Sequence, residues 1–157
     1  MATIRPYRAL RPKKELAEQV ASKPYDVLNS EEAKEEVKDN PNSFLHITKS
    51  EVDMPQGIDI HTPEVYNKAK ENLQKFQEDG ILFQEEKPCY YIYTLVMKGH
   101  EQTGLVCLSS VEDYFNNVIK KHEFTRPEKE KDRIDHMTTI EAQTGKVFLA
   151  YNNVEEI

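Results

Sequence analysis

The chain has 157 residues, 38% of them hydrophobic and 31% charged, and a formal net charge of −7 at pH 7. This length and composition fit one soluble domain with a single hydrophobic core. The acidic balance argues against a general nucleic-acid-binding surface, because no excess of basic charge is available to neutralise phosphates.

The N-terminal part of the chain is predicted to alternate between short strands and helices. Residues 4–10 are predicted to form a strand and residues 13–20 a helix. Residues 24–27 are predicted to form an extended turn, because the residue before a proline is pushed out of the helical region. Ser30 is a suitable cap for a second helix, which Asn40-Pro41 would stop.

Residues 44–48 are predicted to form a strand and residues 50–61 a loop, because the latter combine proline and glycine with few apolar side chains. A long helix is then predicted between Thr62, a natural N-cap followed by Pro63, and Gly80, which suits the position after a helix end. Apolar residues recur between these ends at helical spacing and form one face, which we interpret as core: Val65, Tyr66, Ala69, Leu73 and Phe76.

A β-hairpin is predicted from residues 89–97 and 102–110, joined by a loop at residues 98–101. Both strands are rich in β-branched and aromatic residues, so we expect them to be largely buried. The tyrosines of the first strand have the π-faces needed to stack on a base. Packing, with the hydroxyl at the rim, is the commoner role for such side chains.

The C-terminal part is predicted to begin with a helical turn at residues 111–115. A longer helix follows from a cap at Thr125, where Glu128 completes a capping box, to Gly145. Residues 147–151 are predicted to form a final strand. The buried side of the long helix is predicted from apolar spacing to consist of Ile134, Met137 and Ile140. Together the elements predict a mixed α/β (α+β) domain, with a curved, mainly antiparallel sheet and flanking helices.

Cysteine and histidine usage predicts no disulfide framework and no metal site. Cys89 and Cys107 lie out of register on the two predicted hairpin strands, so reduced cytoplasmic thiols are expected. The five histidines are dispersed, and neither a Cys-x-x-Cys nor a His-Glu-x-x-His motif is present. There is no apolar signal-peptide core and no run of roughly 18 apolar residues, so no membrane association is expected.

The densest group of chemically active side chains lies in residues 120–133, around the start of the last long helix. A helix N-terminus offers free backbone N–H groups and a positive dipole end, which favour phosphate. His122 and Glu123 are the candidates for proton transfer, acting as general base toward an acceptor hydroxyl. The candidate phosphate ligands are Arg8, Thr125, Arg126, Lys129 and Arg133.

The same run also fits a plain solvated helix, because the charges of residues 129–133 alternate in sign. Asp26 in its turn and Asn40 before proline are more simply read as structural residues. Arg8 differs from them. It is one of three closely spaced arginines, and a strand does not need three arginines so close together. Arg8 is the one that we place nearest an anion.

Five motifs occur in fixed order, at residues 4–12, 24–27, 40–46, 121–133 and 142–149. Together they resemble the N-terminal part of the bacterial and archaeal family catalogued as domain of unknown function 1015, nearly from end to end. That family has been described as similar to the ParB/sulfiredoxin superfamily, which includes a nucleotide-dependent free-serine kinase. The resemblance implies a ParB/sulfiredoxin-like fold, a kinase-like phosphotransferase activity, and ATP or another nucleotide with Mg²⁺ as cofactor.

The chain also departs from the family pattern. Lys23-Pro24 stands where the family usually has two prolines, and Lys146 stands where it tends to have one. Family members continue further, and their Gly-His-His-Arg and Tyr-Glu-Thr-Ala signatures lie in a later part that has no counterpart here. We therefore expect the single domain of residues 1–157 to be an N-terminal fragment that supplies part of a site, with the C-terminal half as its partner.

Two functional hypotheses from different classes follow. In the first, the chain belongs to a nucleotide- or phosphate-binding protein that acts as a phosphotransferase on a small phosphate-bearing ligand. In the second, it is a non-enzymatic interaction module whose charged helix docks a protein partner or a C-terminal domain. DNA binding, by analogy with partition proteins, is disfavoured by the acidic charge and by the absence of a helix-turn-helix pattern.

Overall fold

The computed structural model describes residues 2–121 and 125–152. Its α-helices, in chain order, are α1 (Ala17–Val20), α2 (Ser30–Val37), α3 (Leu45–Thr48), α4 (Pro63–Glu78), α5 (Val111–Phe115) and α6 (Pro127–Ile140). Short 3₁₀ turns precede or join them: η1 (Lys14–Leu16), η2 (Tyr25–Val27) and η3 (Ser50–Asp53).

The strands are β1 (Ile4–Arg5), β2 (Leu10–Pro12), β3 (Leu82–Gln84), β4 (Tyr91–Met97), β5 (His100–Val106) and β6 (Leu108–Ser109). They pair antiparallel, β1 with β6, β2 with β3 and β4 with β5. The mixed α+β class and the antiparallel pairing are as predicted. The strands form three two-stranded sheets, however, rather than one continuous curved sheet.

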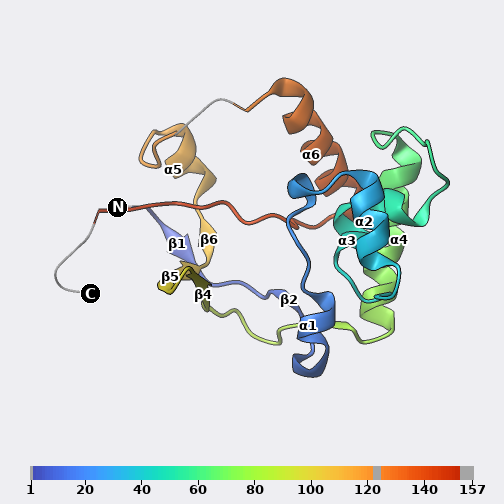
Figure 1. Ribbon diagram of the computed structural model, residues 1–157. Helices are drawn as coiled ribbons and strands as arrows, with labels where there is room; N and C mark the ends of the chain where they lie inside the picture. Colours follow the sequence, from blue (N-terminus) through green and yellow to red (C-terminus); the bar gives the residue numbers. More distant parts are fainter. Residues whose placement is uncertain (1, 122–124, 153–157) are drawn as a thin grey trace.

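Two regions are visible in Figure 1. One contains α2, α3, α4 and α6, and the other contains β1, β4, β5, β6 and α5. The hydrophobic core lies in the helical region, with side chains of α4 at its centre. Its buried members come from α1, α3, α4, β3 and α6: Val20, Ile47, Ala69, Leu73, Phe76, Leu82 and Ile140.

Helix α4 forms where the local signals predicted it. Thr62 has extended N-cap geometry and Pro63 occupies the first helical turn. Gly80 follows the helix with φ 67°, a left-handed conformation that a residue without Cβ adopts at little cost. Every residue of the predicted apolar face is buried, as is Asn72. The prediction of a core-facing helix is confirmed.

The prediction of a strand at residues 44–48 is wrong, because this segment forms the helical turn α3. The Leu45 N–H donates to Ser43 Oγ, and the His46 N–H donates to the Ser43 carbonyl, so Ser43 starts the turn. Leu45 and Ile47 are both fully buried. A short apolar run of this kind fits a buried strand or a buried helix equally well.

The N-terminal elements differ in detail from their predictions. The strand predicted at residues 4–10 is divided into β1 and the start of β2, with an isolated bridge from Tyr7 to Cys89 between them. The extended turn predicted at residues 24–27 is the 3₁₀ turn η2. The cap of α2 is Asn29 rather than Ser30, because the Asn29 side chain forms a capping box with Glu32.

The predicted hairpin is confirmed, but its predicted burial is wrong. The turn consists of Lys98 and Gly99 alone, with φ 52° and 78° as a two-residue type I′ turn requires. The register runs from Tyr91 opposite Val106 to Met97 opposite His100. All residues from 92 to 105 are exposed.

Helix α6 begins and ends at other residues than predicted. Its N-cap is Arg126 rather than Thr125, and no side chain caps it. Pro127 explains the shift, since its fixed φ suits the first helical position and makes the preceding residue the cap. The helix ends at Ile140, with Glu141 as its C-cap at φ 57°, rather than at Gly145.

The buried side of α6 is also partly different. Ile140 is buried and Met137 half-buried as predicted, but Ile134 is exposed, and His136 is buried instead. Residues 147–151 are exposed and have no assigned strand. The prediction of a regular final strand is therefore not met in this structure.

Candidate functional site

The most highly connected polar side chain in the described part of the chain is Asp132 on α6. Its Oδ1 atom accepts hydrogen bonds from Tyr66 Oη and His61 Nδ1, both at 2.8 Å. Its Oδ2 atom accepts from Arg133 Nε at 2.9 Å and from Arg133 Nη2 at 2.6 Å. We call these residues, together with Tyr25, the Asp132 cluster.

The start of α4 and its packing against α6 bring His61 and Tyr66 to Asp132. His61 comes directly before the Thr62 cap, and its backbone N–H donates to Asp59 Oδ1 at 3.0 Å. Tyr66 lies one turn into α4 and is buried against α6. The two partners of Asp132 Oδ1 therefore lie on either side of the N-cap of α4, His61 in the loop before it and Tyr66 in the helix.

Arg133 joins α6 to η2. Its guanidinium carbon lies 4.2 Å from the centre of the Tyr25 ring, within the range of a cation–π contact. The same guanidinium is bonded side-on to Asp132, so two independent contacts fix its orientation. Two of the motifs on which the family resemblance rests, at residues 24–27 and 121–133, meet in this contact.

Hydrogen bonding keeps Asp132 ionised. Its partial burial would raise the pKa, but the hydrogen bonds from His61, Arg133 and Tyr66 outweigh that effect and lower the pKa to about 2. Burial and the hydrogen bond to this carboxylate raise the pKa of Tyr66 well above its ordinary value. At neutral pH the cluster therefore contains a carboxylate that only accepts and a phenol that donates.

This electrostatic arrangement assigns a tautomer to His61. Because the Asp132 carboxylate is an acceptor, neutral His61 carries its proton on Nδ1 and leaves the lone pair of Nε2 free. The His61 side chain is 51% exposed, whereas that of Asp132 is 11% exposed. No hydrogen bond to Nε2 is formed within the described residues. An exposed imidazole oriented by a largely buried carboxylate is suited to accept a proton from a ligand.

Three of the predicted phosphate ligands share one face of α6. Arg126, Lys129 and Arg133 are spaced by three and four residues, which places them along one side of a helix. Arg126 and Lys129 are exposed, and within the described residues Arg126 forms an ion pair with Glu128 at 3.8 Å. Thr125 is also exposed but does not cap the helix.

The other predicted site residues lie elsewhere. Arg8 follows β1, and its Nε donates to the Glu85 carbonyl at 2.7 Å. Figure 1 shows that the segment between β1 and β2 is well separated from the start of α6. The structure therefore does not bring Arg8 to the other candidates. His122 and Glu123, the predicted proton-transfer residues, lie outside the described residues.

The residues that sequence reasoning missed are Tyr25, His61, Tyr66 and Asp132. Tyr66 was assigned to the core, and Asp132 was taken as one charge in an alternating run. A local signal for Asp132 did exist, since it lies four residues before buried His136 and eight before buried Ile140. This spacing places the carboxylate on the inward face of α6.

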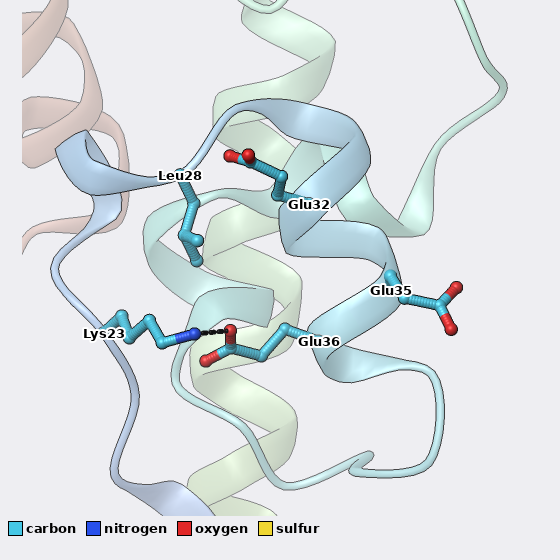
Figure 2. Close-up of a pocket in the computed structure, with 5 residues that line it drawn as sticks. All are labelled: Lys23, Leu28, Glu32, Glu35 and Glu36. Carbon is cyan, nitrogen blue, oxygen red and sulfur yellow. Dashed lines mark hydrogen bonds and ion pairs between the residues drawn. The ribbon is translucent and has the colours of Figure 1, made fainter.

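Two surface hollows are lined by none of the residues of this cluster. The first, of about 420 Å³, is lined by Lys23, Leu28, Glu32, Glu35 and Glu36. Figure 2 shows the Lys23 ammonium bonded to Glu36, at 2.5 Å, while Glu35 points away. The second, of about 350 Å³, lies between α2 and the loop that follows η3, and its lining includes Glu31, Lys34 and Glu51. Carboxylates dominate the first hollow, which makes it a poor site for an anion.

Two further classes of feature are absent from residues 2–121 and 125–152. No three His, Cys, Asp or Glu side chains lie close enough together to hold a metal ion. No helix in these ranges has the length and apolar character needed to cross a membrane. Cys89 and Cys107 are both free thiols.

Comparison with known proteins identifies the family but not an activity. No curated protein and no solved structure matches the chain. The family model described as "Protein of unknown function (DUF1015)" matches residues 4–157, as the order of the motifs predicted. No comparison supports the expected likeness to the ParB/sulfiredoxin superfamily. The chain therefore belongs to the DUF1015 family of proteins of unknown function.

Proposed function

We propose that this chain binds a phosphate-bearing ligand, in the first instance a nucleotide, along the α6 face formed by Arg126, Lys129 and Arg133. In this proposal it supplies part of a phosphotransferase site. The supporting observation is the Asp132 cluster, where an oriented guanidinium and an oriented imidazole share one carboxylate. Phosphoryl transfer depends mainly on positioned charge and on a positioned base, and this pair offers both.

Each residue has a separate role in the proposal. Arg126 and Lys129 contribute positive charge at the exposed helix start, where backbone N–H groups and the helix dipole also favour an anion. Arg133 presents a guanidinium whose direction is fixed by Asp132 and Tyr25. His61 accepts the proton of the acceptor hydroxyl through Nε2. His122 and Glu123 remain the candidate bases nearest in sequence to the helix start.

The nucleotide and its Mg²⁺ ion enter the proposal only as ligand. The described residues include no cluster of three metal-ligating side chains, so they do not form a protein cage for Mg²⁺, and we assign no step to the ion. The remaining ligands of such a site would come from the C-terminal half of the family proteins, which we propose as the partner. A reducing, cytoplasmic setting is proposed from the two free thiols.

The decisive experiment is calorimetry with ATP and Mg²⁺ on the chain and on two variants. Arg126→Ala removes a charge-assisted contact, so affinity should fall on the order of tenfold or more, corresponding to about 1.5–3 kcal/mol. The matched control is Lys131→Ala, because the two side chains are 73% and 75% exposed but Lys131 pairs with Asp135 along the helix.

Neither substitution should change the melting temperature appreciably, because exposed charged side chains contribute little to stability. The proposal fails if millimolar ATP gives no binding heat, or if Lys131→Ala weakens binding as much as Arg126→Ala. A large fall in melting temperature for Arg126→Ala would instead identify Arg126 as a structural ion-pair residue.

A second candidate function is a non-enzymatic interaction module. The specific observation in its favour is that residues 125–131, at the start of α6, are all exposed and mostly charged. Such a surface suits a partner with a complementary charge pattern. This candidate predicts no ATP heat from any of the proteins, and weaker binding of the Arg126→Ala variant to the separately expressed C-terminal half.

A further inference from the structure

Hairpin β4–β5 is exposed on both faces. Side chains alternate between the faces of a strand, so neighbouring residues of β4 point in opposite directions. Ile92 and Val96 lie on one face, Leu95 and Met97 lie on the other, and all four are exposed. An isolated two-stranded hairpin is only marginally stable in water. Its apolar character on both faces indicates that a further element belongs against it.

Strand β4 also has a free edge. Within the described residues it pairs only with β5. In an antiparallel pair, every second residue turns its N–H and C=O groups away from the partner strand. Such an edge is a template for one more strand. The occupant therefore has to be an extended segment with apolar side chains.

Residues 147–151 have this chemistry, and the residue that precedes them contacts β4. Val147, Phe148, Leu149 and Tyr151 are exposed. The preceding residue, Lys146, places its Nζ atom 5.0 Å from the centre of the Tyr93 ring on β4. In Figure 1 the red C-terminal segment runs from α6 across to the strand region.

We infer that residues 147–151 add to the free edge of β4 as a third strand, with the contact between Lys146 and Tyr93 at its start. The addition pairs backbone groups of both segments and places their apolar side chains next to those of β4. A segment of the same chain reaches this edge at a high effective concentration, whereas a second copy would first lose translational freedom. The inference is independent of the proposed phosphate site.

Amide hydrogen exchange on the full chain tests this directly. Alternate amides of β4, those that face away from β5, should exchange about tenfold or more slowly relative to unprotected peptide rates, together with amides of residues 147–151. Protection of α4 amides reports in the same experiment that the fold is intact.

Two proline variants, Val147→Pro and Phe148→Pro, make the test independent of register. Successive N–H groups of a strand point to opposite sides, so one of the two prolines removes a donor that faces β4. That variant should abolish the protection at the β4 edge. Asn152→Pro, just beyond the segment, is the matched control and should retain it.

Three results would overturn the inference. The first is exchange of residues 147–151 at unprotected rates in the unmodified chain. The second is protection of the β4 edge that survives both Val147→Pro and Phe148→Pro. The third is protection that increases with protein concentration, because the added strand would then come from a second copy.

Discussion

At the scale of single residues, Asp132 holds the candidate site together. It joins a loop, α4 and, through Arg133, the η2 turn to α6. Its low pKa means that it is charged throughout the physiological range. A charge that is mostly buried is tolerated only when several donors stabilise it, and removing the charge leaves those donors without a matched acceptor.

Substituting Asp132→Asn should therefore lower the free energy of unfolding by roughly 1–3 kcal/mol, because the amide replaces one of the two acceptor oxygens with a donor, and Tyr66, His61 and Arg133 all need an acceptor. Asp135→Asn is the matched control on the same helix. Among the described residues the Asp135 carboxylate pairs only with Lys131, at the surface, so its loss should cost well under about 1 kcal/mol. Urea titrations measure both values. Equal losses for the two variants would contradict a special role for Asp132.

His46 is the centre of a second hydrogen-bonded group, which shares no residue with the Asp132 cluster. Its Nδ1 lies 2.9 Å from Asp53 Oδ1, and its Nε2 lies 3.2 Å from the Asn40 carbonyl. Both partners are acceptors, so the geometry is satisfied fully only by the doubly protonated imidazolium. The hydrogen bond to Asp53 is the main reason that the pKa of His46 is raised above 6.5. Asn72 completes the arrangement by donating to Asp53.

A raised pKa in the folded state has a definite consequence for the pH dependence of stability. The contribution of His46 is fully present below its unfolded pKa of about 6.5 and is lost as the pH rises through its folded pKa. The loss of stability caused by His46→Gln should therefore be larger near pH 6 than near about pH 8.5.

Comparing variant with parent at each pH is essential, because buried His136 has a lowered pKa and contributes with the opposite sign. The difference between the two proteins cancels the contribution of His136. Unfolding curves in urea at the two pH values supply this difference. A His46→Gln penalty that is the same at both values, or larger at the higher one, would show that His46 is not held as a cation.

At the scale of secondary-structure elements, α4 contributes the largest share of the buried core residues. Leu73→Ala should cost roughly 2–5 kcal/mol, because a fully packed leucine loses both its transfer free energy and its neighbours' contacts. Leu105→Ala on β5 is the matched control, since Leu73 is 6% exposed and Leu105 51% exposed. The control should cost less than about 0.5 kcal/mol in denaturant melts. A loss below about 1 kcal/mol for Leu73→Ala would mean that the buried face of α4 is misassigned.

The elements also show what the sequence could and could not predict. Helix α4 was predicted with its ends and its face, because Thr62, Pro63 and Gly80 are local signals that agree with the apolar period. Helix α3 was missed because its length is too short for a period to be read. The hairpin was predicted from local residues, although its turn has two residues rather than the four predicted at 98–101. Its exposure was not predicted, because burial depends on which distant element covers a strand.

The candidate site was predictable only in part, for a related reason. Arg126, Lys129 and Arg133 lie close together in sequence, so a local pattern identified them. His61 and Asp132 are 71 residues apart, and only the packing of α4 on α6 brings them together. No spacing rule within a single sequence encodes that contact. Pro127 is a local signal that makes Arg126 the N-cap of α6. We gave more weight to the capping-box pattern, which pointed to Thr125.

At the scale of the whole molecule, burial is confined to one part of the chain. No described residue between Leu82 and His136 is buried. The core is therefore built from the helical region together with α1 and β3, and the hairpin and α5 contribute little to it. Because apolar burial is the main favourable term in folding, the two regions should differ greatly in stability.

This difference can be tested by replacing residues 92–105 with Asn-Gly. Tyr91 and Val106 are opposite each other in the register, so a two-residue turn can close the gap between them. The shortened chain should keep the melting temperature of the helical region nearly unchanged, and Leu73→Ala should cost the same in it as in the full chain, because distant sites without shared partners behave additively. Circular dichroism melts and urea titrations of the four proteins measure both effects. If removing the hairpin collapses the helical signal, the two regions form one cooperative unit, and the exposed faces of β4 and β5 must be covered in solution by contacts that stabilise the core.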